Sequence, residues 1–137
     1  KNCVECHGAD GQGESQADGT YLSPPLWGND SYNHGAGMHR LITAAEFIKG
    51  NMPFQQATYD KPVLTDEEAY HVAAYINSFD RPLKSNPELD FPKKELKPAS
   101  TPYGPWKDSF SADQHKYGPF QPIFEFYEKQ YGIKKNK

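Results

Sequence analysis

The sequence predicts a small all-α domain, residues 1–82, followed by an extended arm, residues 83–137, that is rich in proline and aromatic side chains. Two stretches with apolar residues at helical spacing each begin at a Thr that is followed three residues later by Glu. From Pro82 onward, prolines recur too often for regular structure. The chain has 137 residues, 36% of them apolar, and a mean hydropathy of −0.89. It therefore has the length of one domain but little apolar material for a core.

The first element is the motif Cys3-Val4-Glu5-Cys6-His7. Two cysteines separated by two residues and followed at once by histidine form the C-x-x-C-H pattern of c-type haem attachment. The two thiols reach the two vinyl groups of one porphyrin, and the adjacent imidazole then lies under the iron. We therefore predict one covalently bound haem c, with Cys3 and Cys6 as attachment points and His7 as the proximal iron ligand.

The motif has three other possible uses. A zinc site needs further ligands, but the chain has only two cysteines and no second ligand cluster. A thioredoxin-like redox pair needs a βαβ pattern, which is absent. A disulfide between Cys3 and Cys6 leaves His7 unexplained. The glycine-rich residues 8–13 also resemble the loop that follows the haem-binding histidine in class I cytochromes c, and this favours haem.

Residues 1–22 continue from the motif as a glycine-rich loop, and Ser23 to Gly28 form a turn-prone segment. This segment resembles the P-x-L-x-G stretch of class I cytochromes c, with Pro24, Leu26 and Gly28 in the matching places. The resemblance implies that the carbonyl of Pro24 accepts a hydrogen bond from the proximal imidazole, which orients the ring and increases its basicity. Pro25 could take that place instead, and a rigid surface turn is the alternative to both.

Two helices are expected in the remainder of the domain. The capping box Thr43 to Glu46 predicts a short helix that ends near Gly50. The second box, Thr65 to Glu68, predicts a helix with an apolar face that closes at residues 80–82. That face consists of Ala69, Val72, Ala73, Ile76 and Phe79. The resemblance implies that this second helix is the C-terminal helix that packs across the haem in class I cytochromes c.

The sixth iron ligand has several candidates. Met52 precedes a proline after a glycine-terminated helix, which resembles the setting of the axial methionine in class I cytochromes c. Met38 is the other methionine and is expected to fill a gap in the core. Bis-histidine ligation would draw on the histidines outside the motif, which are His34, His39, His71 and His115. We expect Met52 to be the ligand, and Trp27 and Phe54 to pack on the porphyrin.

The arm reads as extended and irregular, but it is too rich in aromatic residues for a disordered segment. We expect it to wrap against its own domain or a partner, with a short helix over residues 123–131 and a frayed end at residues 134–137. Residues 1–82 hold 5 Lys and Arg against 11 Asp and Glu, a net charge of −6, whereas residues 83–137 hold 10 against 7, a net charge of +3. An acidic chain without a basic stripe is not expected to bind nucleic acid.

The compartment follows from the motif. Covalent haem attachment is extracytoplasmic in bacteria, so we expect a periplasmic protein whose signal sequence has been removed. No stretch approaches the length of a membrane span. Class I cytochromes c have a helix that leads into C-x-x-C-H, and since that helix is almost missing here, we expect the chain to be a fragment of something longer.

A more specific resemblance covers nearly the whole chain. The matching segments are Pro25 to Gly28, Tyr32-Asn33, Gly35 to Met38, Thr43 to Ala45, Phe47-Ile48, Asn51 to Pro53, Ala69-Tyr70, Val72 to Asn77, Thr101 to Pro105 and Gln114 to Phe120. They resemble the C-terminal haem domain of thiosulfate dehydrogenases, periplasmic dihaem cytochromes c that join two thiosulfates into tetrathionate. In that family catalysis takes place at the other haem, which has His/Cys ligation. Both cysteines here are committed to haem attachment, so the resemblance implies the electron-transfer haem alone.

Three functions remain open. The first is a monohaem electron carrier or subunit of the periplasm, which exchanges electrons with protein donors and acceptors and has no catalytic residue of its own. The second is the electron-exit domain of a dihaem thiosulfate dehydrogenase or tetrathionate reductase whose catalytic haem domain lies outside this chain. The third is a haem-based sensor, which would need a labile or absent Met52 ligand.

Overall fold

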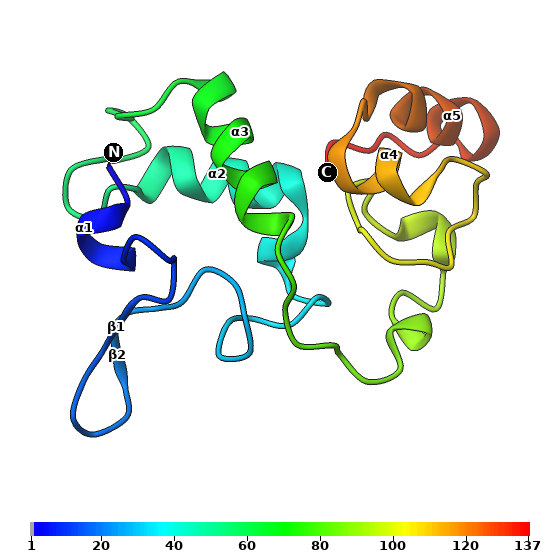
Figure 1. Ribbon diagram of the computed structural model, residues 1–137. Helices are drawn as coiled ribbons and strands as arrows, with labels where there is room; N and C mark the ends of the chain where they lie inside the picture. Colours follow the sequence, from blue (N-terminus) through cyan, green and yellow to red (C-terminus); the bar gives the residue numbers. More distant parts are fainter. Residues whose placement is uncertain (1) are drawn as a thin grey trace.

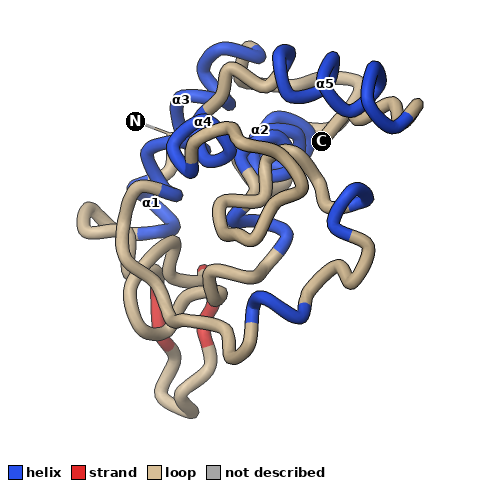
Figure 2. Tube along the Cα trace, turned by 90° about the vertical axis from the view of Figure 1, so that its right-hand side faces the viewer, coloured by secondary structure: helices blue, strands red, loops and turns tan. Residues whose placement is uncertain are grey.

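The computed structural model describes residues 2–137 and is mostly helical (Figure 1). Its elements are α1 (Val4–His7), β1 (Glu14–Ser15), β2 (Tyr21–Ser23), the 3₁₀ turn η1 (Gly37–His39), α2 (Leu41–Asn51), α3 (Asp66–Asn77), the 3₁₀ turns η2 (Pro87–Leu89) and η3 (Lys94–Leu96), α4 (Ala112–Tyr117) and α5 (Gln121–Tyr131). Helices α1 to α3 form one half of the molecule, and the arm with α4 and α5 forms the other half (Figure 1). The tube in Figure 2 shows how much of the chain is loop. The predicted fold class is confirmed.

The core lies between α2 and α3. Both helices present small and aliphatic residues at spacings of three and four, which bring those side chains onto one face. The core cluster consists of Leu41, Ala44, Ala45 and Ile48 from α2 and Ala69, Ala73 and Ile76 from α3. Its four alanines are at most 3% exposed, and their short side chains let the two helix backbones approach closely. The cluster therefore packs α2 and α3 into one unit.

The start of α3 is as predicted. The hydroxyl of Thr65 accepts a hydrogen bond from the Glu68 backbone N–H at 3.2 Å, and the Glu68 carboxylate accepts one from the Thr65 backbone N–H at 2.9 Å. Hydrogen bonding to Thr65 also lowers the pKa of Glu68. The helix thus begins with two of its free backbone donors satisfied.

The predicted capping box at Thr43 is wrong. Helix α2 begins at Leu41 after an extended Arg40, so Thr43 lies inside the helix. Leu41 is 4% exposed and belongs to the core cluster, and burial of this residue extends the helix beyond the local capping signal. The Thr43 hydroxyl is buried without a hydrogen-bond partner in the part of the chain that the structure describes.

A two-stranded ribbon interrupts the predicted loop after the motif. Strands β1 and β2 pair antiparallel with a bulge, and Glu14 lies opposite Ser23. Between them the Thr20 carbonyl accepts a hydrogen bond from Gln16, and the Asp18 carboxylate accepts bonds from the Thr20 amide and hydroxyl. Both strands are mostly exposed. Strand prediction relies on alternating apolar residues, which an exposed ribbon does not need.

The arm is less extended than the sequence indicates. It contains α4, α5 and an arm cluster of Ala99, Ile123 and Tyr127, which are at most 2% exposed. Helix α5 begins two residues before the helix that we expected. The frayed end is wrong: the Lys137 carbonyl accepts from the Ala99 amide at 2.6 Å, and the Lys135 ammonium donates to the carbonyls of Glu95 and Lys97 at 2.8 and 2.5 Å.

The arm contacts the α1–α3 half at separate places. The amide of Lys84 donates to His34 Nδ1 at 2.7 Å, and the His34 ring meets Tyr103 edge-on at 5.2 Å. The Lys137 ammonium lies 2.7 Å from the Glu46 carboxylate on α2. Phe120 packs against both the core cluster and the arm cluster. The arm thus lies against the chain's own helices, although a domain boundary at residue 82 stays a prediction.

Candidate haem-binding site

Helix α1 carries the motif in a single turn. Cys3 is its N-cap residue, and Cys6 and His7 form its end. Cys3 and Cys6 are three residues apart, so their side chains lie on the same side of the turn. Both are free thiols, Cys3 half-buried and Cys6 exposed. They are therefore available for two thioether bonds to one porphyrin.

The imidazole of His7 is oriented by a contact with a backbone carbonyl. Its Nδ1 lies 2.8 Å from the carbonyl oxygen of Pro24. A carbonyl can only accept, so Nδ1 carries the proton and Nε2 is left with its lone pair. This is the tautomer that a metal-ligating imidazole needs. The contact also selects Pro24 over Pro25 as the acceptor.

Three of the predicted site residues come together at the core. Leu26, Trp27 and Met52 are partly buried and pack against the core cluster. Phe54, by contrast, is 71% exposed, and the structure does not bring it into that group. Leu26, Trp27 and Met52 thus form an apolar group, and the packing of Trp27 and Phe54 on a porphyrin stays a prediction.

Met52 is placed by the end of α2. Its amide donates to the Ile48 carbonyl at 2.9 Å, and its own backbone is extended, as expected for a residue before proline. Met38 also packs against the core cluster. The Met38 carbonyl accepts a hydrogen bond from the Asn77 side chain at 3.0 Å, which ties its backbone to the end of α3. The two methionines therefore occupy different surroundings, one at a helix end and one in a polar network.

The alternative histidine ligands are dispersed and largely engaged. His39 is 7% exposed, and its Nδ1 donates to the His34 carbonyl at 2.8 Å. Burial lowers the pKa of His39 to about 4, so this ring is neutral at neutral pH. His115 lies in the arm with both nitrogens in contact, one with Ala99 and one with Asp108. His71 is exposed on α3.

Sequence reasoning missed the buried guanidinium of Arg81. It is 9% exposed and donates to the carbonyls of Leu26, Tyr32 and Ile76 at 3.4, 3.3 and 3.0 Å. It also lies 4.1 Å from the centre of the Tyr32 ring. Burial lowers the pKa of Arg81. Arg81 therefore joins the segment around Leu26 to the end of α3, and only its position after an apolar helix could have indicated this.

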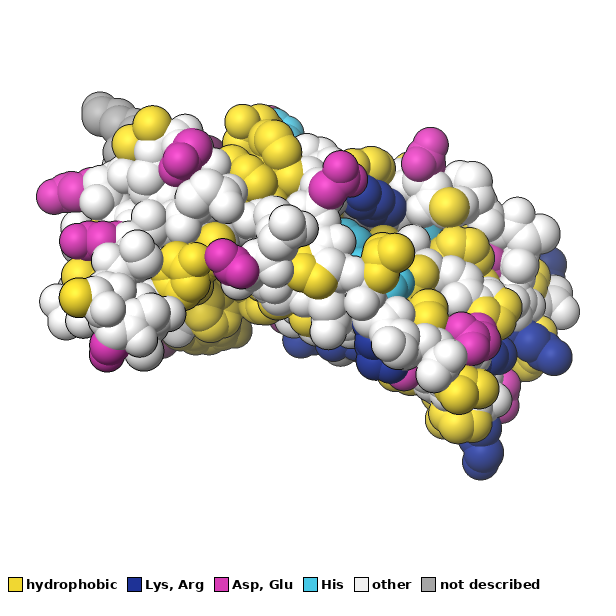
Figure 3. Space-filling view, turned by 60° about the horizontal axis from the view of Figure 1, so that its bottom comes forward, with side chains coloured by type: hydrophobic (Ala, Val, Ile, Leu, Met, Phe, Trp, Pro, Cys, Tyr) yellow, Lys and Arg dark blue, Asp and Glu magenta, His cyan; other side chains and the backbone are white. Residues whose placement is uncertain are grey.

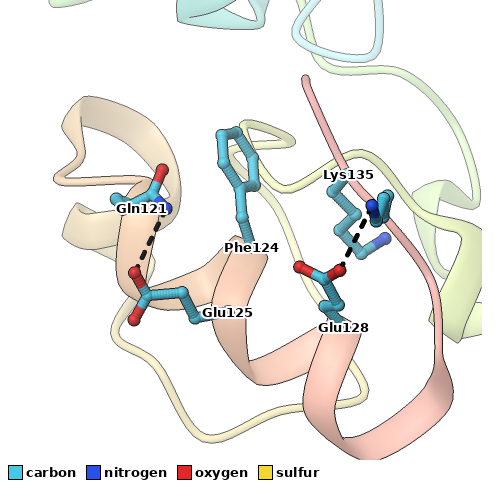
Figure 4. A pocket seen from close by; sticks show the side chains of 6 residues that line it. Gln121, Phe124, Glu125, Glu128 and Lys135 are labelled. Atoms are coloured by element: carbon cyan, nitrogen blue, oxygen red, sulfur yellow. Dashed lines mark hydrogen bonds and ion pairs between the residues drawn. The ribbon is translucent and has the colours of Figure 1, made fainter.

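The surface differs between the two halves. In Figure 3 carboxylates are prominent toward the α1–α3 end, whereas Lys and Arg gather toward the arm. One cavity of about 210 Å³ lies on the arm, between α5 and the C-terminal residues. Figure 4 shows its lining side chains, among them Phe124, Glu128 and Lys135. None of the predicted haem-site residues lines it.

The chemistry of this donor set fits haem c. Two free thiols on one helical turn, an imidazole with its Nε2 lone pair available and a soft thioether at an apolar surface are the groups that such a haem uses. The hydrogen bond from His7 to Pro24 adds the outer contact that fixes a ligating ring. The residues present are therefore those that a covalent porphyrin would require.

Comparisons with known proteins support a haem c site in this chain. The cytochrome c family model matches residues 1–80. A thiosulfate dehydrogenase from Stutzerimonas stutzeri is 55% identical over 82 residues, which are 60% of this chain and 25% of that protein. The thiosulfate dehydrogenase of Allochromatium vinosum is 51% identical over 88 residues, 64% of this chain and 31% of that protein. A solved structure of thiosulfate dehydrogenase (TsdBA) from Marichromatium purpuratum, in its "as isolated" form, matches with a TM-score of 0.54 and 52% identity, and covers 62% of this chain and 17% of that one.

The chain spans about a quarter to a third of the length of these curated relatives. The predicted resemblance to thiosulfate dehydrogenases is confirmed over 60% to 67% of the chain rather than over nearly all of it, and it implies covalently bound haem c and haem-based electron transfer. No helix within residues 2–137 is long and apolar enough to cross a membrane. Since the family model matches more than half of its residues, the chain belongs to the cytochrome c family.

Proposed function

We propose that this chain carries electrons through a haem that is joined to Cys3 and Cys6 and ligated by His7 and Met52. The observation that carries the proposal is the 2.8 Å contact between His7 Nδ1 and the Pro24 carbonyl, because it leaves Nε2 as the ligating atom. The haem supplies a one-electron couple. The chain supplies an oriented imidazole, a thioether and an apolar surface, and these set the reduction potential.

Electron transfer rather than ligand sensing is favoured by the number of ligands. If the His7 imidazole from α1 and the Met52 thioether from the end of α2 both held the haem iron, no coordination position would be left for an exogenous molecule. We therefore expect a low-spin, six-coordinate iron in both oxidation states. Ready binding of CO to the native ferrous protein would instead support the haem-based sensor.

Met52→His tests the sixth ligand. A histidine in place of the thioether should lower the reduction potential and keep the iron six-coordinate, because the soft thioether stabilises the ferrous state. Met38→Leu is the matched control, since Met38 packs against the same core cluster. We expect Met38→Leu to leave the potential close to that of the wild type. An unchanged potential in Met52→His, or a large shift in Met38→Leu, would contradict the assignment.

We propose that the protein lies in the bacterial periplasm. Covalent haem attachment, for which the motif offers two free thiols, is an extracytoplasmic process in bacteria. Its partners are an electron donor and an electron acceptor. Redox encounters of this kind bury little surface, roughly below 1,200 Å² in total. The chain needs no catalytic residue for this role, because outer-sphere transfer requires only contact near the haem edge.

The second candidate is the electron-exit domain of a dihaem thiosulfate dehydrogenase or tetrathionate reductase. It is favoured by 41% to 55% identity to thiosulfate dehydrogenases that are several times longer than the matched region. The intact mass of the native full-length protein separates the two candidates. One covalent haem supports the monohaem carrier. Two haems support the dihaem enzyme, and thiosulfate oxidation would then be assayed.

A further inference from the structure

We propose that Trp27 is a positioning residue for the proximal histidine. It holds residues 8–13 against α3, and residues 8–13 in turn hold the Pro24 carbonyl to which His7 donates. The inference rests on the proposed function, since it concerns the orientation of an iron-ligating imidazole. Every contact in it belongs to residues of this chain.

The need for such support arises in α1 itself. The helix has four residues, none of them buried, and Cys3 makes no side-chain capping bond. One turn of helix has little stability of its own. The orientation of the His7 ring therefore depends on contacts from outside the helix, and the one that its Nδ1 makes is with Pro24.

Gly13 connects His7 to Pro24. The Gly13 amide donates to the His7 carbonyl at 2.8 Å. A Cβ at Gly13 would overlap the Ser23 carbonyl oxygen and come within 2.8 Å of the Pro24 carbonyl carbon. The backbone of Gly13 thus lies directly against the peptide whose oxygen accepts from His7. A displacement of residues 8–13 would therefore change the His7–Pro24 distance.

Trp27 covers the same loop at Gly11. Leu26 donates its amide to the Gly11 carbonyl at 2.8 Å, which brings the next residue over the loop. A Cβ at Gly11 would overlap the six-membered ring of Trp27, with Cζ3 at 2.7 Å. Gln12 adds a bond from its side-chain amide to the Trp27 carbonyl at 3.3 Å. One face of the indole is thus in contact with the loop backbone.

The indole is also packed against α3 and its end. It stacks on Phe79 with ring centres 4.2 Å apart and an angle of 13°, and Tyr75 meets its edge at 6.0 Å. Trp27 also packs against the core cluster. Aromatic pairs of this kind stabilise packing beyond the effect of their buried area. The stack therefore joins the packed helices α2 and α3 to residues 8–13, and these residues contact the Pro24 peptide.

The chemical consequence concerns the basicity of the proximal ligand. A firm hydrogen bond from Nδ1 to Pro24 makes the His7 ring a better donor to iron and stabilises the ferric state. Replacement of Trp27 by Leu removes the stacked surface, lets residues 8–13 move and weakens that bond. We expect a higher reduction potential and a less protected Nδ1 proton. Added water at the site would lower the potential, so the sign separates the two causes.

The test compares Trp27→Leu with Trp27→Phe in the haem-loaded protein. The readouts are the exchange rate of the His7 Nδ1 proton, measured by NMR in the diamagnetic ferrous state, and the reduction potential. In Trp27→Leu we expect exchange to be faster by about tenfold, the change that loss of one net hydrogen bond would give, together with a raised potential. Trp27→Phe keeps an aromatic ring over Gly11, so its exchange rate and its reduction potential should both stay close to those of the wild type.

Two further variants complete the design. Phe79→Leu removes the stacking partner but keeps the indole, and should shift both readouts in the same direction by less; it decides the question if Trp27→Leu does not fold. Trp106→Leu is the matched control, because that tryptophan stacks on His115 in the arm at 4.3 Å. It should reduce stability without affecting the His7 proton.

The outcomes are separable from those of the proposed function. If the wild-type protein shows no protected His7 Nδ1 proton, the ligand assignment fails before any variant is compared. If the wild type shows that proton and Trp27→Leu leaves its exchange and the potential unchanged, only the role of Trp27 is overturned. A lowered potential with unchanged exchange would also overturn it, because solvent entry would then be the cause.

Discussion

At the scale of single residues, burial decides more than residue type. His34 and His39 lie five residues apart, yet of the two only His39 is buried. Its Nδ1 donates to the His34 carbonyl, and its Nε2 is buried without a partner among the residues described. Burial lowers the pKa of His39 to about 4 from an ordinary value of 6.5. As the pH falls, His39 therefore gains its proton at a higher pH in the unfolded chain than in the folded chain.

The sign of the pH dependence follows from this difference. Between pH 6.5 and about 4 the unfolded state holds more protons at His39, so the free energy of unfolding falls as the pH falls through this range. The full effect is up to about 3 kcal/mol. Denaturant unfolding at a series of pH values should show a smaller loss in His39→Gln than in the wild type. The exposed His71→Gln is the control, and an equal change in both variants would contradict the prediction.

At the scale of elements, local signals were correct where no tertiary contact opposed them. The box at Thr65 stands at an exposed helix start, and α3 begins there. The same pattern at Thr43 does not cap a helix, because Leu41 is buried in the core cluster and α2 already begins at that residue. The ribbon of β1 and β2 is held by backbone and turn bonds without an apolar pattern, so no periodicity could have indicated it.

The two threonines give a matched pair of variants. Thr65→Ala removes an N-cap and should lower the free energy of unfolding by about 1 kcal/mol. Thr43→Ala removes a buried hydroxyl that has no partner within residues 2–137, so it should be neutral or stabilising. Chemical denaturation of both proteins measures the difference. Equal losses would show that Thr43, too, acts as a cap.

The sequence indicates that the arm is wrapped, but not which contacts fold it. Its density of proline and aromatic residues indicated a wrapped segment, but the partners of those side chains are far apart in sequence. The Asp108 carboxylate accepts hydrogen bonds from Tyr127 at 2.6 Å, from the His115 ring at 2.9 Å and from the Phe110 amide at 3.0 Å. Burial raises the pKa of Tyr127, so it remains a donor. This network joins the segment before α4 to both arm helices.

Asp108→Asn tests whether the network holds the arm together. The side chains of Asp108 and His115 are 0% and 1% exposed, and removal of one partner from a buried pair costs about 3–5 kcal/mol. Amide hydrogen exchange should therefore accelerate in α5 while α3 keeps its protection. Asp113→Asn, at the exposed start of α4, should change neither helix. Loss of protection in α3 as well would show that the arm and the core cluster unfold as one unit.

At the scale of the whole molecule, the family could be predicted from the sequence, because C-x-x-C-H is a local pattern; the haem ligands that C-x-x-C-H and Met-Pro indicate stay a prediction. The docking of the arm could not be predicted, since it depends on contacts such as Lys84 with His34 and Lys137 with Glu46. That docking places a segment of net charge +3 beside one of −6, and the propionates of a bound haem would add further negative charge to the latter. The molecule is therefore electrically asymmetric, and the acidic half is the one that holds the haem motif.

This asymmetry predicts which reagents exchange electrons fastest. If electrons enter at the acidic half, a cationic inorganic complex should be attracted there and an anionic complex of similar size repelled. Raising the ionic strength shortens the Debye length from about 30 Å at 0.01 M to about 8 Å at 0.15 M. The bimolecular rate constant should then fall for the cation and rise for the anion, as measured by stopped-flow spectroscopy of the haem. Lys134→Gln, at an ammonium that is 84% exposed on the arm, should change neither rate. Faster reaction of the anion at low salt would place the entry point of electrons beside the arm instead.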